Sequence, residues 1–290
     1  MVSPASLLAR CVFPSAGTPV SCAVSGGADS LSLLVLAVEA GCQVTAIHVD
    51  HGLRQGSAAE SDVVAAAAER FGASFRSLKV DVAVGPNLEA RARTARYSVL
   101  PAEVFTGHTA DDQAETVLLN MLRGSGVDGL AAMRRDRRPL LDLRRSDTVA
   151  LCKALDLPAV EDPMNIDPAY MRVRVRHELL PLMNEIADRD VVPVLARQAD
   201  RMRSVADLME QLAEGVDVID AKVLRTLHPE VAAVALRRWI RDSTGDEHPV
   251  DAASIERLMQ VVNNEILATE VTGGHRVART QNRLRIVRAE

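Results

Sequence analysis

The chain has 290 residues, of which 48% are apolar and 25% charged, so it is long and apolar enough to bury a sizeable core. Its formal net charge of −5 gives no global signature of a nucleic-acid binder, and the lack of any bilayer-length apolar run predicts a cytoplasmic protein with no membrane association. The four cysteines are widely spaced and form no C-x-x-C pair. This spacing argues against a zinc site, an iron–sulfur cluster or a disulfide framework.

Strand and helix patterns alternate four times in the first half of the chain. The expected strands are 20–24, 43–50, 74–82 and 104–107, and the expected helices are 31–40, 57–71, 87–100 and 109–123. This alternation predicts an α/β fold with a Rossmann-like parallel sheet and helices on both faces. Ligands of such sheets bind outside the carboxyl ends of the strands. Residues 25–30, Asp50-His51 and His108 all follow expected strands, so we expect them to meet at one crevice.

The second half of the chain is mainly helical. A glycine-rich loop at 124–129 and a helix at 147–157 come first, and a long amphipathic helix begins near Val191. Further helices are expected at 229–242 and 251–262, followed by a small hairpin within 271–290. We therefore predict a first domain at 1–188 and a smaller, mainly helical domain at 189–290 that ends in this hairpin.

The segment Ser25-Gly26-Gly27-Ala28-Asp29-Ser30 turns from the first expected strand directly into a helix. A helix N-terminus presents unpaired N–H groups with a positive partial charge, and glycine lets the backbone approach a phosphate closely. Ser25 and Ser30 add hydroxyl donors, and Asp29 adds a carboxylate that could hold Mg²⁺ bridging phosphates. The segment has neither the Gly-Lys-[Ser/Thr] ending of a Walker loop nor a Gly-x-Gly-x-x-Gly fingerprint. It predicts a different kind of nucleotide-phosphate site.

A second focus runs from Gly107 to Thr116. Asp112 and Glu115 share one face of the expected helix, away from its apolar stripe. Two acidic groups near a phosphate crevice could share Mg²⁺ or hold a cationic amine, but acidic residues also suit the first turn of any helix. Both interpretations stay open, as do a phosphate-binding and a solvated role for Arg93 and Arg96.

Histidine and arginine supply the remaining candidates. His48 lies inside an expected strand and is expected to be a hydrogen-bonded structural residue. The sequence has lysine only at Lys79, Lys153 and Lys222, and every other basic residue is arginine, much of which genomic composition bias would explain. Arginine nevertheless binds phosphate well and is clustered here, which indicates a local RNA-binding face. The clustered arginines are Arg134, Arg135, Arg137, Arg138, Arg144, Arg145, Arg172, Arg174 and Arg176.

The hexapeptide at 25–30 resembles the PP-loop of the ATP-pyrophosphatase superfamily. Taken with further blocks in the same order, the chain resembles the tRNA(Ile)-lysidine synthetase family over roughly residues 20–183. These blocks are 48–54, 89–97, 108–126, 138–141 and 161–181. Three positions depart from the family pattern without removing a charge: Thr109 replaces a common histidine, Met164 a usual serine and Val173 a usual asparagine. The C-terminal part matches weakly.

The resemblance implies an ATP-dependent ligase that joins free L-lysine to C2 of the wobble cytidine in the CAU anticodon of tRNA(Ile). The cytidine is first adenylated with release of pyrophosphate, and lysine then displaces AMP. The implied catalytic residues are Asp29, Arg93, Arg96, His108, Asp112 and Glu115. The implied ATP contacts are Ser25, Gly26, Gly27, Ala28, Asp29 and Ser30, with Mg²⁺ on Asp29. The implied tRNA contacts are the arginines of 134–145 and 172–176, in particular Arg134, Arg135, Arg137, Arg138, Arg172, Arg174 and Arg176. The resemblance also implies that the domain at 1–188 is the ATP-binding catalytic domain and that the domain at 189–290 contacts tRNA.

Two alternatives remain at this level. Another PP-loop adenylating enzyme, such as a tRNA thiolase, would need a sulfur carrier, usually visible as paired cysteines, and the sequence has none. A nucleotide-gated RNA-binding protein without catalysis would bind ATP but show no turnover. The sequence does not determine the oligomeric state, and a homodimer stays open.

Overall fold

The computed structural model of the protein describes residues 2–50, 52, 57–81, 88–160, 167–245 and 250–288. The chain forms two compact units, of which the first comprises Met1–Asn120 with Ala132–Ala199 and the second Met121–Ala131 with Asp200–Glu290. The expected boundary at residue 188 therefore lies inside the first unit. The reason is packing, because Val192, Leu195 and Ala199 are buried in the same apolar cluster as Leu118.

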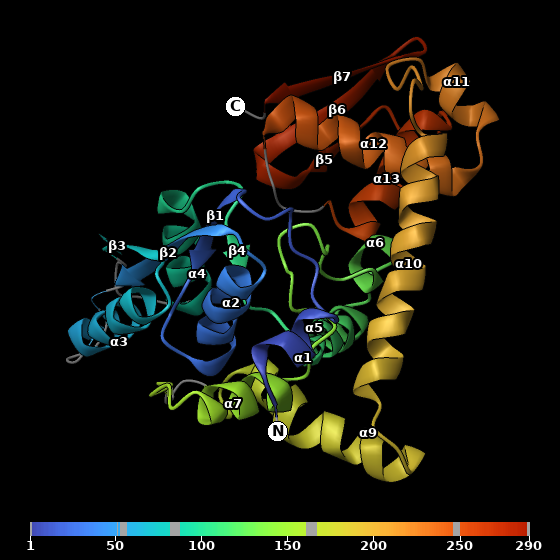
Figure 1. Ribbon diagram of the computed structural model, residues 1–290. Helices are drawn as coiled ribbons and strands as arrows, with labels where there is room; N and C mark the ends of the chain where they lie inside the picture. The colour runs from blue at the N-terminus through green and yellow to red at the C-terminus, as the bar shows by residue number, and fades with distance from the viewer. Residues whose placement is uncertain are drawn as a thin grey trace. The chain divides into compact units, whose positions relative to one another are not determined.

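A four-stranded parallel sheet is the centre of the first unit (Figure 1). Its strands are β1 (Pro19–Ala23), β2 (Gln43–Asp50), β3 (Ser74–Lys79) and β4 (Phe105–Thr106), and they lie in the order β3-β2-β1-β4. All three strand pairs are parallel. The predicted fold class is thereby confirmed. The carboxyl ends of β1, β2 and β4 are adjacent at one edge of this sheet, as the crevice hypothesis requires.

Helices cover both faces of the sheet. The helices of the α/β part are α1 (Pro4–Leu8), α2 (Ala28–Glu39), α3 (Ser57–Arg70), α4 (Leu88–Val99), α5 (Ala110–Leu122) and α7 (Arg145–Ala154). Side chains of α2, α3 and α7 pack in one core with Cys22 and Val44 of the sheet. Ile47 and Val49 point the other way, into a smaller core with Ala95 of α4. This alternation follows from the period-two geometry of β2.

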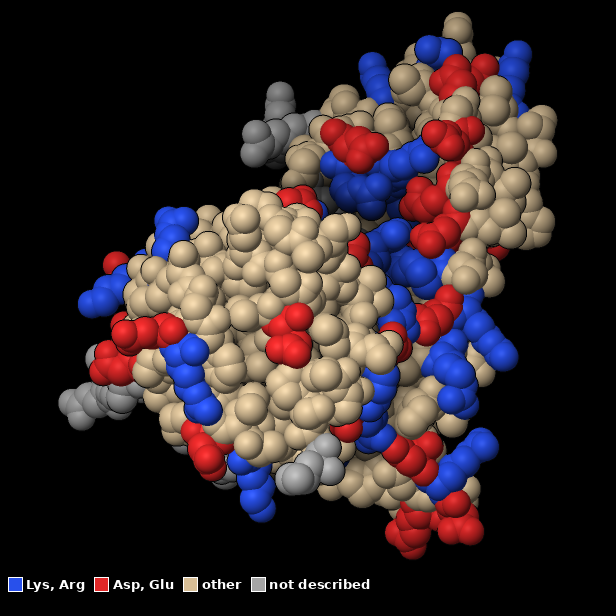
Figure 2. Space-filling model, in the orientation of Figure 1, with Lys and Arg blue, Asp and Glu red and all other residues tan. Residues whose placement is uncertain are grey.

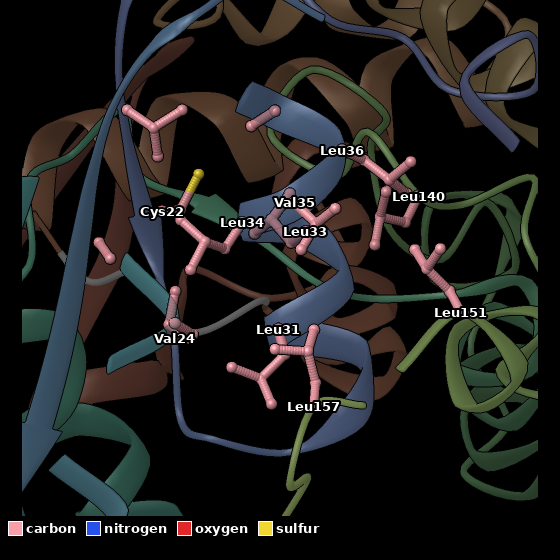
Figure 3. Close-up of a cluster of buried hydrophobic side chains, with 14 of the residues drawn as sticks. Cys22, Val24, Leu31, Leu33, Leu34, Val35, Leu36, Leu140, Leu151 and Leu157 are labelled. Carbon is pink, nitrogen blue, oxygen red and sulfur yellow. The ribbon is translucent and has the colours of Figure 1, made fainter. Parts of the chain in front are cut away.

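Helix α2 is apolar all round because it is covered on both sides. Figure 3 shows Leu34 directed toward Cys22 of β1 and Leu36 directed toward Leu140, and all four of these side chains are fully buried. Its N-terminal turn carries Asp29 and Ser30, so the most thoroughly buried helix of the core fixes the position of the phosphate-loop residues. A rigid element of this kind suits a site that must hold a precise geometry.

The first unit continues through α8 (Met171–Arg174), a π-helical turn at Val175–Leu179, α9 (Leu180–Ala187) and the start of α10 (Val192–Leu212). The Leu180 N–H donates to the Val175 carbonyl, five residues back. Pro181 explains the wide turn, because proline has no N–H to donate to residue 177 and its ring would clash with that carbonyl in a regular α-helix.

The second unit contains α6 (Val127–Leu130), the rest of α10, α11 (Ala221–Thr226), α12 (Pro229–Thr244), α13 (Ala252–Val262) and a small sheet. The expected terminal hairpin is a three-stranded antiparallel sheet of β5 (Ala268–Val271), β6 (His275–Thr280) and β7 (Arg283–Arg288). The hairpin prediction missed β5, which is only four residues long and pairs with β6 across the Gly273-Gly274 turn. Val271, Val277 and Leu284 bury one face of the sheet against α12 and α13.

Charge is mixed on the surface of the protein. Figure 2 shows basic and acidic side chains interspersed on the face in view, in keeping with an acidic chain that carries local arginine clusters. None of the helices in the described part of the chain combines the length and apolar character needed to cross a bilayer.

Candidate active site

The loop at residues 25–30 is held by its own hydrogen bonds. The Ser30 hydroxyl donates to the Gly27 carbonyl at 2.9 Å, and the Ser25 N–H donates to the Ser30 oxygen at 3.1 Å. Gly26 has a φ of +92°, a region that favours glycine, and its carbonyl accepts the Val160 N–H at 2.9 Å. Ser30 is buried and therefore shapes the loop, while Gly27 is the N-cap of α2 and makes no side-chain cap bond.

Gly107 brings the end of β4 into close contact with this loop. A Cβ atom at residue 107 would lie 2.6 Å from the Asp29 carbonyl oxygen and 3.1 Å from the Ser30 Cα. Real side chains do not approach backbone atoms so closely, so this position requires glycine. The contact joins the two sequence motifs, because Gly107, which directly precedes His108, lies against the loop at residues 25–30.

Asp29 is held from α7. The Thr148 hydroxyl donates to Asp29 Oδ1, and Arg145 Nε donates to Asp29 Oδ2 at 3.3 Å. Burial raises the pKa of Asp29 above its usual range, and Arg145 and Thr148 offset this only in part. A carboxylate with so few donors retains the capacity to bind a further cation.

Asp112 both caps the first turn of α5 and contributes an acidic group to the site. Its Oδ2 accepts the Thr109 N–H at 2.9 Å and the Thr109 hydroxyl at 3.1 Å, which completes the first turn of α5. Its Oδ1 accepts Arg145 Nη2 at 2.8 Å. Burial by itself would raise the pKa of Asp112. The charges of Arg145 and Arg172 and the hydrogen bond from the Thr109 N–H lower it, and the net result is a pKa below the usual range. Asp112 is therefore ionised at neutral pH.

Glu115 is completely buried and is bound by three arginines. Its Oε1 accepts Arg145 Nη1 at 3.1 Å and Arg176 Nε at 2.7 Å. Its Oε2 accepts Arg172 Nε at 2.8 Å and Arg176 Nη2 at 3.0 Å. Three guanidinium groups compensate the desolvation of this carboxylate, which would otherwise be prohibitive.

The cluster as a whole is electrically balanced. Its three carboxylates come from Asp29, Asp112 and Glu115 and its three cations are arginines, so its formal charge is 3 − 3 = 0. We refer to these three carboxylates, with the Arg145 guanidinium among them, as the acidic pocket.

A second group of cations lies around Tyr97, and two of its members, Arg93 and Arg138, are within electrostatic range of His108. The guanidinium carbons of Arg93 and Arg96 lie 5.0 and 5.5 Å from the centre of the Tyr97 ring. Arg138 is within electrostatic range of Tyr97 and Arg93, and its buried Nε makes no hydrogen bond within the described residues. This concentration of positive charge suits an anion.

His108 itself is neutral at physiological pH. Burial lowers its pKa to about 4, and the nearby Asp112 charge offsets this only in part. Its Nδ1 is 2.8 Å from the Thr106 hydroxyl. His48, in β2, has its Nδ1 3.0 Å from the Val24 carbonyl, so the prediction of a hydrogen-bonded structural histidine is confirmed.

The low pKa of His108 makes stability depend on pH. Between about pH 6.5 and 4 the unfolded chain binds a proton that the folded protein does not, so the free energy of unfolding falls as the pH is lowered through this window. We expect a loss of about 1–2 kcal/mol from this group between pH 7.5 and 5. Urea unfolding at both pH values checks this, and a His108→Gln variant should lose less stability; an equal loss in both proteins would contradict it.

The arginines predicted to contact tRNA divide into two sets. Arg172 and Arg176 are directed to Glu115, and Arg145 lies in the acidic pocket, because the buried carboxylates there need cations. Arg144 pairs with Asp111 and Asp190. Arg138 is partly buried beside Tyr97 and Arg93. The other four are more accessible: Arg134 is exposed, Arg135 pairs with Asp142, Arg137 with Glu103 and Arg174 with Glu178.

Arg145 and Thr148 are the site residues that sequence reasoning missed. The sequence predicts a tRNA contact for Arg145, as a member of the arginine cluster, and predicts no role for Thr148. One local signal was present, because Arg144 and Arg145 are the N-cap and first residue of α7, where the helix dipole disfavours cations unless acidic partners lie nearby. His51, Asn87 and residues 161–166, which belong to other predicted features, lie outside the described residues.

Comparison with known proteins identifies the class. The family model of the PP-loop domain matches residues 5–183. The fold resembles the solved structure of the U34-tRNA thiolase NcsA from Methanococcus maripaludis with its [4Fe-4S] cluster, with a TM-score of 0.55, 17% identity and coverage of 69% of this chain and 78% of that chain. At this identity the likeness concerns the fold alone. The chain therefore contains a PP-loop ATP-binding domain.

Curated relatives define the family more closely. The tRNA(Ile)-lysidine synthase of Nocardia farcinica is 40% identical over 96% of this chain and 91% of its own length. The corresponding synthase of Salinispora arenicola is 38% identical over 95% and 92%, and that of Rhodococcus erythropolis is 44% identical over 75% and 72%. The chain belongs to the tRNA(Ile)-lysidine synthase family, a family of ATP-dependent ligases, as its sequence blocks indicated.

Proposed function

We propose that the protein ligates free L-lysine to C2 of the wobble cytidine in the CAU anticodon of tRNA(Ile). The C2 oxygen attacks the α-phosphorus of ATP and pyrophosphate leaves. The ε-amine of lysine then attacks C2, loses a proton and displaces AMP, which carries away the former C2 oxygen. Cytidine, lysine and ATP thus give lysidine, AMP and pyrophosphate.

One observation carries the proposal beyond family membership. Arg145 bridges Asp29, at the phosphate loop, to Asp112 and Glu115, so the nucleotide site and the acidic pocket are immediate neighbours. A ligase of this kind needs both, because the activated oxygen and the attacking amine must meet at one atom. Carboxylates bind the cationic amine of lysine and exclude neutral amino-acid side chains.

Two sets of groups would stabilise the charge on the phosphates. The free N–H groups at the start of α2 face the loop, and the helix dipole reinforces them. The cations around Tyr97 would neutralise the departing pyrophosphate. These are Arg93, Arg96 and Arg138.

The residues present also fit Mg²⁺. Among the described residues no group of three or more His, Cys, Asp or Glu side chains is arranged to enclose a metal ion. Mg²⁺ in nucleotide enzymes usually needs only one or two carboxylates together with substrate phosphates, and Asp29 at the phosphate loop supplies one. Bound there, the ion would screen the phosphate charges.

We assign tRNA binding to the accessible arginines and to the second unit. Arg135, Arg137 and Arg174 lie where their guanidinium groups can exchange an acidic partner for a phosphate, and Arg134 is exposed. Each such contact adds affinity that falls with salt concentration. Arg172 and Arg176 would act on the RNA indirectly, through the position of Glu115. Arg138 would contribute from the phosphate set.

The test measures AMP and pyrophosphate release from ATP with tRNA(Ile) bearing a CAU anticodon, with and without lysine. tRNA(Met), which has the same anticodon, is the control. We expect turnover and incorporation of labelled lysine only with tRNA(Ile). Bound ATP without turnover on either tRNA would contradict the proposal and favour a non-catalytic RNA-binding protein.

A thiolase is the second enzyme to exclude. Cys22, Cys42 and Cys152 are buried, and burial raises the pKa of each thiol, to about 12 for Cys22. Buried thiols with a raised pKa are poor sulfur carriers. Sulfur incorporation into tRNA in the presence of a sulfide donor would contradict the ligase proposal.

Thr148 offers a selective test of the nucleotide site. Thr148→Val removes the hydroxyl bound to Asp29 but keeps the buried shape, so we expect kcat/KM for ATP to fall by about tenfold or more and the Mg²⁺ requirement to rise, with little change in the KM for lysine. Thr148→Ser should restore both. Equal changes in the ATP and lysine constants would contradict this role.

Two further predictions concern the whole protein. A homodimer stays open, and light scattering at several concentrations would determine the mass in solution. Cytoplasmic localisation stays a prediction from the sequence, and cell fractionation would test it.

A further inference from the structure

Arg145 makes an unusual set of contacts. Each of its three guanidinium nitrogens donates to a different carboxylate: Nε to Asp29 at 3.3 Å, Nη2 to Asp112 at 2.8 Å and Nη1 to Glu115 at 3.1 Å. Burial by itself would lower the pKa of Arg145, but these carboxylates outweigh it and raise the pKa. The guanidinium therefore lies where the proposed function places the amine of lysine.

Removal of this one cation would change the pocket in a specific way. Glu115 would keep Arg172 and Arg176, so the buried carboxylate would remain compensated. Asp112 would keep only distant cations, at 3.7 Å from Arg172 and 3.9 Å from Arg176. The formal charge of the cluster would become 2 − 3 = −1, which a single ammonium group restores to zero.

The side chain is able to leave. It is 26% exposed, and its contact with Asp29 is the longest of the three. Asp29 belongs to the first turn of α2, beside the phosphate loop, so the polyphosphate of ATP would arrive next to Arg145. Guanidinium binds phosphate oxygens in bidentate geometry at least as well as it binds carboxylates, and ATP brings several negative charges at once.

We propose that Arg145 couples nucleotide binding to amine binding: before ATP binds its guanidinium fills the acidic pocket, and the phosphates draw it out so that the ε-amine of lysine can enter. This inference rests on the proposed function. It makes Arg145 a positioning residue that sets the order of binding, with ATP before lysine. By linkage, lysine must then tighten nucleotide binding by the same factor.

Calorimetric titration of the full chain with L-lysine tests the coupling, with and without saturating α,β-methylene-ATP and Mg²⁺. For the unaltered protein we expect the nucleotide to tighten lysine binding by about tenfold or more, within the usual range of coupling energies. Arg145→Gln should bind lysine with the same affinity, within about twofold, with or without nucleotide. Arg144→Gln is the matched control, because Arg144 pairs with Asp111 and Asp190 outside the pocket, and it should retain the coupling.

A second variant keeps the test decisive if Arg145→Gln does not fold. Arg145→Lys retains the charge but can contact the carboxylates at only one atom, so its coupling should fall below that of the unaltered protein. Coupling that persists undiminished in either Arg145 variant would overturn the inference and leave the ligase proposal intact. Absence of lysine binding in every variant, with and without nucleotide, would overturn both.

Discussion

Replacement of Glu115 by alanine is expected to lower the free energy of unfolding by about 3–5 kcal/mol, which corresponds to a fall in Tm of roughly 10 °C for a domain of this size. Glu115 is 0% exposed and is the shared partner of three arginines, so its loss would remove the closest counter-charge of Arg172 and Arg176 and leave the cluster with a net positive charge. Lysine incorporation should be abolished, because the proposed amine site would become cationic. Urea unfolding and the tRNA assay measure the two effects.

Glu178 provides a matched control for this substitution. It also binds an arginine, Arg174, with an Nη2 to Oε2 distance of 2.8 Å, but both side chains are more than half exposed. Solvent screens exposed helical ion pairs of this kind, so Glu178→Ala should be nearly neutral for stability. Similar losses in the two variants would show that burial does not determine the importance of Glu115. Glu115→Gln should fold better than Glu115→Ala but remain inactive.

The second large effect is expected from Gly107→Ala. The added Cβ would lie 2.6 Å from the Asp29 carbonyl oxygen, so either β4 or the first turn of α2 must move. We expect a cost of about 1–3 kcal/mol in stability and a loss of more than about tenfold in ATP affinity, because the displaced turn carries the phosphate loop. Thermal unfolding and titration with an ATP analogue measure these changes.

Gly126→Ala is the control for Gly107. No atom among the described residues lies within 4 Å of a Cβ at position 126, and its φ of −76° is accessible to alanine. The change should cost less than about 1 kcal/mol and leave ATP affinity unaltered. If Gly107→Ala binds ATP as tightly as Gly126→Ala, the close approach of β4 does not fix the loop.

Local patterns predicted the elements of the first unit well. The strand at Gln43–Asp50 was predicted residue for residue, and the helix from Ser57 ended one residue earlier than expected. These elements could be predicted because their periodicity and their turn residues lie within a short stretch of sequence. The phosphate loop could be predicted for the same reason. Its strand–turn–helix context lies within about twenty residues.

The acidic pocket could be predicted only in part, because it is assembled from distant segments. Asp112 and Glu115 were found from their spacing on one helix, but their partner Arg145 lies 30 to 33 residues further along the chain. The hydrophobic periodicity of the two segments does not predict that Arg145 of α7 contacts the carboxylates of α5. The same limit applies to Thr148, which lies 119 residues from Asp29. The first unit extends to Ala199, beyond the expected boundary at 188, for the same kind of reason, because α10 continues the core of this unit.

The exclusive use of arginine around the acidic pocket has a chemical consequence. In the proposed reaction an activated cytidine would react with any primary amine that reaches its C2 atom, so a lysine side chain of the enzyme would compete there with free lysine. A guanidinium group supplies the same positive charge but stays protonated, and its delocalised nitrogens are poor nucleophiles. The sequence contains lysine only at positions 79, 153 and 222, none of which is among the ion pairs of the pocket. The pocket thereby holds its charge balance without an internal nucleophile, which under the proposed mechanism would protect the enzyme from covalent attachment to its own RNA substrate.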